Sequence, residues 1–572
     1  MAARSAWEQA SAAALAAAVG FEKHIAGSRL ALVAAPNSPI ALGREGFVLG
    51  EIYERGRAAA MATINDTDAR LIVQSCGQRL IQGHWGSYVA FLASRDRDRL
   101  EVLRAPFGNL PCYYFETAYG LFVASDVDLL VCFAGFEPRV AWCHVAETLV
   151  ADDLARRATC LDALSELSGG ERLIHSGANW SIDAPWRIWD FTAREHRLED
   201  PDDAVRRVRD AVKLAVAGRA SRHGKILLRL SGGLDSSVVA AALASADHPF
   251  VALTLVTRDR AGDERSHARD VATRFGVPLV EAERDKGLID VAASAARGLP
   301  RPSVRAFTQA SLRLSVDAAR ACGATALFDG GGGDNMFAAL SSLAPVADCL
   351  HRDGGTGHFW RAARSIGIAT QTSTLTVARM ALVRCWTRGP GYRWPVDASL
   401  LTAEARVDVR GAAAHPWLEP PPGALAGSAA HVALLVAAQS LVQGRGLRTD
   451  LPEVSPLVTQ PVAEVCLRVP SWLWTRDGHN RAIARDAFRA LLPPSIVDRR
   501  DKGSPGGFVA ELFEANYDRI RILLLDGCLV GNGVVDRVST NAALREARGM
   551  RAHGYRRIMQ LVDVEAWARS WS

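Results

Sequence analysis

Residues 227–240 have the sequence LLRLSGGLDSSVVA, an apolar run, a Ser-Gly-Gly turn and a second apolar run. This pattern predicts a buried strand, a tight turn and the first turns of a helix. Glycines let a backbone approach an anion closely, and the N–H groups of a helix N-terminus point toward it. We therefore predict a nucleotide phosphate site, formed by Leu230, Ser231, Gly232, Gly233, Ser236 and Ser237.

Asp235 lies inside this predicted cradle and has a different role. A carboxylate there would repel phosphates unless a cation lay between them, so it indicates Mg²⁺ held against a pyrophosphate. The stretch lacks the Lys of GxxxxGK[ST] and is not a Walker loop. It resembles the pyrophosphate loop of ATP pyrophosphatases, which cleave ATP between the α- and β-phosphates and adenylylate a substrate. That resemblance implies ATP and Mg²⁺ as cofactors.

A second glycine run occurs in residues 326–337, ALFDGGGGDNMF. A predicted strand again meets glycines and then an acid. Four consecutive glycines lose backbone entropy on ordering and add no side-chain contacts, so we expect their backbone to approach a ligand closely. Gly332 is the glycine of this run that we assign to the ligand site.

Composition sets bounds on the class of protein. The chain has 572 residues, which favours two domains, and a net charge of only +5, which does not predict nucleic-acid binding. Its ten cysteines contain no CxxC pair and are expected to be reduced thiols. The apolar stretch at 12–19 is a poor signal peptide, and no run of 18 apolar residues predicts a membrane span. We expect a cytoplasmic enzyme.

The pattern of apolar and polar residues along the chain changes near residue 195. Residues 29–189 are short alternating segments, which predict a layered, β-rich domain, whereas strands and helices alternate after Asp200, the expected N-cap of a long helix. Alternation predicts a parallel sheet with ligands at the carboxyl ends of its strands. The segments expected as strands in the first part are 30–35, 46–53, 69–74, 86–94, 100–105, 113–116 and 121–124.

Both parts of the chain resemble the asparagine synthetase B-like family. GHWGSYVAF at 83–91, RAPFGNLPCYY at 104–114 and FVASD at 122–126 resemble its glutamine-hydrolysing, N-terminal-nucleophile (Ntn) domain. The resemblance implies an α+β, glutamine amidotransferase-like domain at 1–195 and an α/β synthetase domain of the ATP pyrophosphatase or adenine nucleotide α hydrolase type at 200–572. The chain starts Met1-Ala2-Ala3, and its first cysteine is Cys76, so we expect a degenerate first domain without glutaminase activity.

The resemblance also implies roles for single residues. The strand end at Val256 and Thr257 would hold adenine, Asp235 and Asp334 would hold Mg²⁺, and Lys502 would reach the α-phosphate. The family's two glutamates in the second glycine run are replaced here.

These replacements leave the base for the attacking amine open. Gly331 and Asn335 stand where the family has the two glutamates, and Glu453 is only a candidate for the base. Arg481 and Arg485 fit a solvated basic face as well as they fit a phosphate site.

The glycine run with Asn335 and the stretch RDKGS at 500–504 look most like the lasso peptide cyclase branch. That branch implies adenylylation of an Asp or Glu side chain of a precursor peptide and attack by the N-terminal amine of the peptide, which closes a macrolactam. It also implies the precursor peptide, a leader-peptide-binding protein and a leader peptidase as partners. The alternatives are a β-lactam synthetase-like enzyme, an ammonia-dependent asparagine synthetase, a tRNA-modifying pyrophosphatase-loop enzyme and a nonenzymatic ATP-binding scaffold.

Overall fold

The computed structural model describes residues 22–26, 30–35, 38–94, 99–117, 120–176, 179–257, 263–350, 356–407, 411–447, 449, 451–500, 506–548 and 555–572. The chain divides into two compact units. Unit 1 comprises Met1–Arg139, Arg156–Arg187 and Gly298–Pro300, and unit 2 comprises Val140–Ala155, Ile188–Arg297 and Arg301–Ser572. Each unit therefore contains short segments that lie far from the rest of it in the sequence.

Unit 1 is built from antiparallel strands, as the alternating texture predicts. A six-stranded sheet has the order β11 (Asn179–Asp183), β10 (Arg172–Ser176), β6 (Arg99–Arg104), β5 (His84–Ser94), β4 (Gly46–Glu54) and β3 (Pro39–Ala41). A three-stranded sheet has the order β8 (Gly120–Ala124), β7 (Tyr113–Thr117) and β9 (Ser165–Glu166), and β1 (Glu22–Ala26) pairs with β2 (Leu30–Ala34). Apolar side chains of both larger sheets form the core of unit 1, among them Phe47, Phe91, Val102, Leu121 and Val123.

One predicted strand of unit 1 is wrong. Residues 69–74 lie in helix α2 (Asp66–Gln74), and α3 (Gln78–Gly83) and α4 (Val127–Ala134) are the other described helices of this unit. The side chain of Asn65 accepts a hydrogen bond from the N–H of Asp68 and caps α2. Ala69, Ile72 and Val73 are buried at helical spacing, so capping and packing override the β preference of a short apolar run.

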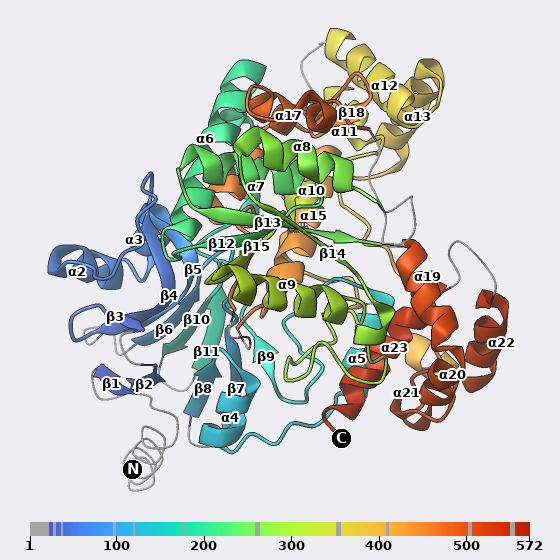
Figure 1. Ribbon diagram of the computed structural model, residues 1–572. Helices are drawn as coiled ribbons and strands as arrows, with labels where there is room; N and C mark the ends of the chain where they lie inside the picture. Colours follow the sequence, from blue (N-terminus) through green and yellow to red (C-terminus); the bar gives the residue numbers. More distant parts are fainter. Residues whose placement is uncertain are drawn as a thin grey trace, which may run out of the picture. The chain divides into compact units, whose positions relative to one another are not determined.

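Unit 2 contains the predicted parallel sheet. Its five strands, all parallel, have the order β14 (Leu279–Glu283), β13 (Phe250–Val256), β12 (Ile226–Arg229), β15 (Ala326–Phe328) and β16 (Glu453–Val454). Figure 1 shows α9 (Thr308–Cys322) on one face of the sheet and α7 (Leu234–Ser245) and α8 (Arg265–Phe275) on the other. The predicted alternation of strands and helices is confirmed.

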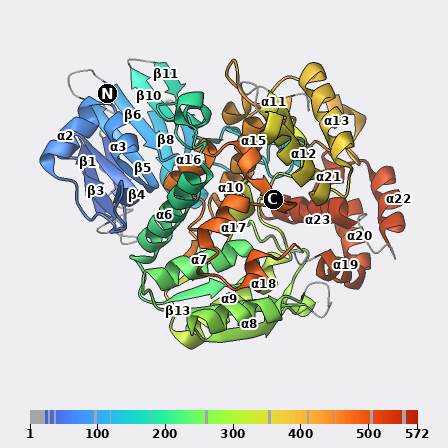
Figure 2. The same ribbon diagram turned by 90° about the horizontal axis from the view of Figure 1, so that it is seen from above.

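The long helix α6 (Pro201–Ala220) begins where the sequence predicts. Asp200 caps it by accepting from the N–H groups of Asp202 and Asp203, and its valines at 208, 212 and 216 are buried. It packs against α16 (Gln460–Arg468) and α17 (Ala482–Phe488), as seen from above in Figure 2. A two-stranded hairpin, β17 (Thr475–Arg476) and β18 (His479–Asn480), leads into α17.

The other helices of unit 2 surround this framework. They are α5 (Trp142–Val150), α10 (Gly333–Met336), α11 (Ala344–Leu350), α12 (Thr356–Ala369), α13 (Thr374–Thr387), α14 (Ala403–Val407), α15 (Ala426–Val442), α18 (Pro494–Val497), α19 (Gly506–Ala515), α20 (Tyr517–Leu525), α21 (Cys528–Gly531), α22 (Arg537–Ala547) and α23 (Tyr555–Arg569). Among the described residues, we find no helix whose length and apolar character would let it cross a bilayer.

Candidate active site

The two predicted glycine loops lie side by side at the carboxyl edge of the parallel sheet. The first follows β12 and leads into α7, and the second follows β15 and leads into α10. β12 and β15 are hydrogen-bonded neighbours, so both loops and both helix N-termini meet at the same edge. This is where ligands bind in open parallel sheets.

The first loop is held in shape by its own hydroxyl groups. Ser237 Oγ donates to the carbonyl of Gly233 at 2.7 Å, and Ser236 Oγ accepts from the N–H of Ser231 at 3.3 Å. Gly232 has a φ of 70°, and a Cβ there would lie 2.5 Å from that of His267. Leu230 is buried at the end of the strand. Glycine at 232 is therefore required by both backbone conformation and space.

The second glycine run packs against the first loop. A Cβ on Gly330 would collide with the N–H of Ser236, and one on Gly333 would lie 2.5 Å from the Cβ of Asp235. Gly332 has a φ of 74°, and a Cβ there would meet Val458. The expected close backbone approach therefore occurs, but to the protein's own chain, which brings Asp334 beside Asp235.

Arg481 joins the two acids that the sequence assigns to the metal. Its Nη1 lies 2.9 and 3.0 Å from the two carboxylate oxygens of Asp235, and 2.6 Å from Oδ1 of Asp334. Asp235 and Arg481 are both buried. One guanidinium thus bridges two carboxylates in the first turns of α7 and α10.

The β17–β18 hairpin aims Arg481 at this place. Arg476 pairs with His479 across a two-residue turn, Asp477-Gly478, in which both residues have positive φ. Arg481 follows the hairpin with a φ of 56° and occupies the N-cap position of α17, where its side chain makes no capping hydrogen bond. The Asp-Gly turn is a strong hairpin signal in a sequence, so it could have separated Arg481 from a solvated basic face.

Arg485 supports this arrangement one turn later. It is buried and donates to the carbonyl groups of Asn480 and Ile496 at 2.9 and 3.4 Å, and to that of Val497 at 2.5 Å. Burial, together with repulsion by Arg481 and against the attraction of Asp235, lowers the pKa of Arg485 to about 10. Arg485 therefore stays charged at neutral pH and ties α17 to the segment that leads toward residue 500.

A second arginine, Arg499, bonds to the backbone of the first loop. Arg499 donates to the carbonyl of Gly232 at 3.1 Å and to Oε1 of Glu264 at 2.7 Å. Glu264 directly precedes α8, so its negative charge also interacts favourably with the positive N-terminal end of the dipole of this helix.

The residues that replace the family's glutamates have neighbours of their own. A Cβ on Gly331 would lie 2.8 Å from Oδ1 of Asp329 and 2.9 Å from Oγ of Ser455. Asn335 donates its side-chain N–H to the carbonyl of Leu434 at 2.8 Å, which fastens the loop to α15. Asn335 is therefore a structural residue in this chain.

Glu453 belongs to a network of charges at the ends of β12, β15 and β16. Arg229 donates to Glu453 Oε2 at 2.6 Å and to Asp329 Oδ2 at 3.2 Å. Ser455 donates to Oδ1 of Asp329 at 2.7 Å, as does the N–H of Gly331 at 2.9 Å. The candidate base is thus paired with an arginine, and Asp329 is the carboxylate that borders Gly331.

A buried histidine supports the second loop from below. His431 of α15 lies 3.0 Å through Nε2 from the carbonyl of Met336, the last residue of α10. Burial lowers the pKa of His431 to about 4, so its ring is neutral at physiological pH.

The residues that the sequence assigns to adenine and to the α-phosphate are Val256, Thr257 and Lys502. Val256 and Thr257 are buried at the carboxyl end of β13, where the carbonyl of Val256 accepts from the N–H of Arg284 at 2.8 Å, and their predicted contact with adenine stays a prediction. Lys502 lies outside the described residues, and its predicted role stays a prediction.

The acid pair fits a magnesium ion. Mg²⁺ binds to proteins through one or two carboxylates together with substrate phosphates and water. Asp235 and Asp334 supply two carboxylates that already share one positive charge, that of Arg481. Because a guanidinium occupies the position between them, Arg481 has to move for a metal ion to bind both acids.

Comparisons with known proteins give the family. The model of the family described as asparagine synthase matches residues 207–569. The tRNA-specific 2-thiouridylase MnmA of Caulobacter sp. (strain K31) is 32% identical over 176 residues, which cover 28% of this chain and 41% of that protein. The chain thus spans less than half the length of this curated relative.

Two solved structures also match. They are entitled structure of the allosteric regulatory enzyme of purine biosynthesis and glutamine phosphoribosylpyrophosphate (PRPP) amidotransferase from B. subtilis complexed with ADP and GMP. They are 10% and 9% identical, cover 46% and 49% of this chain and 65% and 66% of their own chains, and have TM-scores of 0.17, too low to carry an argument about the fold. The family match, by contrast, covers more than half of the sequence, and the chain belongs to the asparagine synthase family of ATP-dependent amide-forming ligases.

Proposed function

We propose that this chain is a lasso peptide cyclase. It adenylylates an Asp or Glu side-chain carboxylate of a precursor peptide with ATP and joins it to the peptide's N-terminal amine, releasing AMP and pyrophosphate. The observation that carries the proposal is the pairing of Asp235 and Asp334 on one cation, between two glycine loops at the carboxyl edge of the sheet. An anion that binds there meets helix N-termini and Arg481 together.

The choice of an amine within the same molecule rests on the second glycine loop. Gly331 has no side chain, and the side chain of Asn335 is committed to Leu434, so neither position offers a base for a free amine. An amine on the same peptide as the activated carboxylate gains effective concentration from being intramolecular, which can replace part of such assistance. This argument favours a peptide over free ammonia.

The chain's own residues have separable tasks in this proposal. The N–H groups of the first loop bind phosphate oxygens, and Arg499 and Glu264 hold that loop in place. Asp235 and Asp334 would hold Mg²⁺, which supplies positive charge to the departing pyrophosphate. Lys502 is assigned to the α-phosphate, and the precursor peptide, a leader-binding protein and a leader peptidase are the partners.

Mass spectrometry of the purified chain with ATP and Mg²⁺ tests the proposal. The substrates are leaderless peptides with an N-terminal Gly and an Asp or Glu several residues on, aspartate with ammonium, and a β-amino acid with a tethered amine. We expect AMP and loss of one water from the peptide only.

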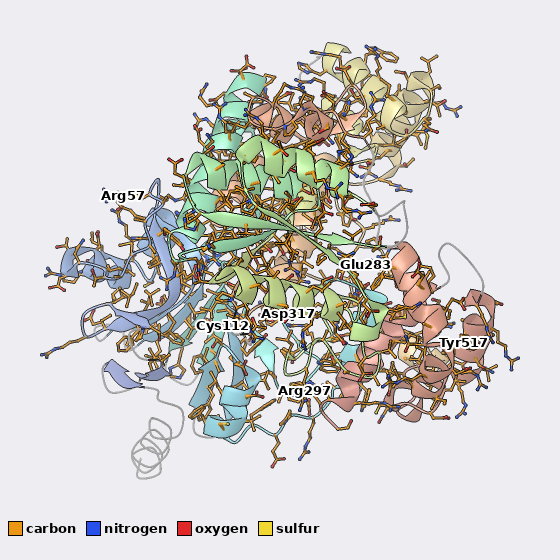
Figure 3. All side chains as sticks on the ribbon, viewed as in Figure 1. Arg57, Cys112, Glu283, Arg297, Asp317 and Tyr517 are labelled. Atoms are coloured by element: carbon orange, nitrogen blue, oxygen red, sulfur yellow. The ribbon has the colours of Figure 1, made fainter. Side chains whose placement is uncertain are left out.

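Variants make this test specific. Asp235→Asn should abolish the loss of water, while Asp317→Asn, on α9 (Figure 3), should leave it unchanged. AMP formed with aspartate and ammonium, or with the β-amino acid, and not with the peptides would refute the proposed substrate and indicate a small-molecule synthetase. Nucleotide binding without AMP from any substrate would refute catalysis.

A further inference from the structure

Helices α12 and α13 form a hairpin whose inner side is already packed. The two helices lie side by side in both views (Figures 1 and 2) and share a core with α11 and Trp472. The buried residues of the hairpin in this core are Phe359, Ala362, Ala363, Ile366, Val377, Ala378 and Ala381. Its inner apolar side chains therefore need no further partner.

The outer side of α13 is apolar as well. Leu375, Leu382, Val383 and Trp386 are exposed, and their spacing places them on one side of the helix, opposite the buried residues. Trp386 is 91% exposed and Leu375 is 72% exposed. A helix that is apolar on two opposite sides normally buries both. The stripe formed by Leu375, Leu382, Val383 and Trp386 is therefore a surface for contact with another molecule.

The charge of the hairpin region has one sign. Residues 356–396 contain six arginines and no aspartate or glutamate. Arg379 lies on the same side of α13 as the stripe, and the ion pairs found between described residues include none of these six arginines. The arginines are Arg361, Arg364, Arg379, Arg384, Arg388 and Arg393. The surface is therefore complementary to an anionic partner.

We propose that the outer face of α12 and α13 binds an anionic phospholipid membrane surface. Tryptophan, leucine and arginine on one exposed helix side are the side chains that insert at the boundary between headgroups and acyl chains. A side chain in a groove keeps much of its surface covered, whereas Trp386 projects almost fully, as insertion into a lipid layer requires.

The geometry of α13 fixes how the contact would be made. The helix has 14 residues, fewer than the roughly 20 needed to span a bilayer, so it lies along the surface. This binding is independent of the proposed reaction and would bring the active chain to a membrane. Figure 1 shows the hairpin in yellow at the border of the drawing.

Vesicle cosedimentation tests the proposal with the full chain. We expect binding to vesicles of equal parts phosphatidylglycerol and phosphatidylcholine, no binding to phosphatidylcholine alone, and release at high salt. The variant Arg379→Glu with Arg388→Glu should weaken binding at least about 25-fold, from about fivefold per arginine near the surface. Leu375→Ser with Trp386→Ser should weaken it by at least about tenfold through lost apolar insertion.

A matched control lies on another exposed helix. Arg521→Glu with Ile522→Ser on α20 removes one exposed arginine and one exposed apolar side chain, and should leave vesicle binding unchanged. Equal binding by the Leu375 and Trp386 variant would overturn the proposal. A second outcome would also overturn it. If the wild-type chain does not bind anionic vesicles but forms a concentration-dependent dimer, and the Leu375 and Trp386 variant does not form that dimer, then a second copy of the chain covers the stripe.

Discussion

Replacing Arg481 with methionine removes the cation that Asp235 and Asp334 share. The side chains of Arg481 and Asp235 are only 9% and 12% exposed, whereas that of Asp334 is 38% exposed. Breaking a buried pair by removing one partner costs about 3–5 kcal/mol, and a pair with an exposed partner contributes less than about 1 kcal/mol. Because the site mixes both cases, we expect Arg481→Met to lower the free energy of unfolding by about 2–4 kcal/mol in a chelating buffer.

Magnesium provides the decisive second measurement. In the variant, the two carboxylates lose the guanidinium that they share, so Mg²⁺ should bind without ATP and restore about 2.7 kcal/mol at a hundredfold excess over its dissociation constant. The wild-type chain should gain much less, because Arg481 already occupies the position between the acids.

The assay is urea unfolding with and without Mg²⁺, with Arg476→Met as the matched control. Arg476 makes an ion pair with Asp486 and is half exposed, so its loss should cost less than about 1 kcal/mol and show no magnesium effect. An Arg481→Met chain as stable as wild type, or one that Mg²⁺ does not stabilise, would refute the argument that Arg481 holds the metal position.

Three further changes test the surroundings of the site. Gly333→Ala places a Cβ 2.5 Å from that of Asp235, so it should separate the two loops and weaken the binding of ATP with Mg²⁺, measured by calorimetry. The control is Gly531→Ala, where the added Cβ has no neighbour within 4 Å and should have a much smaller effect. His431→Leu leaves the carbonyl of Met336 without its buried donor and should cost about 1–3 kcal/mol in urea unfolding. Burial raises the pKa of Asp563 to about 7, so the folded chain holds a proton there that the unfolded chain loses near pH 4, and stability should fall as pH rises from about 4 to about 7. Asp563→Asn keeps an acceptor for the N–H of Ala306 and should flatten that slope between pH 5 and 7.5; an unchanged slope would contradict this cause.

The local parts of the site could be predicted from the sequence. The strands at 226–229 and 250–256, the cap at Asp200 and the two glycine loops follow from periodicity, turn residues and capping over short stretches. The meeting of Asp235 with Asp334 was expected from the family resemblance, and the structure explains it, because the carboxyl ends of the neighbouring parallel strands β12 and β15 share one edge of the sheet. The wrong strand at 69–74 shows the limit of a short apolar run, which packing can turn into a helix.

The long-range partners could not be predicted in the same way. Arg481 and Asp235 are separated by 246 positions in the sequence, and Glu453 and Arg229 by 224. The sequence around Glu453 and Arg229 does not distinguish these side chains from solvated charges, since they become partners only when β12 and β16 join the same sheet. For Arg481 the Asp477-Gly478 turn is a local signal, but its partners are set by the packing of α17. Likewise, the close packing of the second glycine loop against the first could not be predicted from the sequence, and the approach to a ligand that its glycines indicated stays a prediction.

The position of Arg481 is set by packing and does not require a bound nucleotide. Ser365 of α12 accepts from the N–H of Asp477 at 3.1 Å, and Gly478 lies so close to Ile368 that a Cβ would collide with it. The hairpin that aims Arg481 is thus fixed by α12 on one side, while Arg485 fixes α17 on the other. The fold therefore brings the two acids together around one guanidinium, so metal binding would exchange this cation for another and would not have to assemble two unscreened carboxylates.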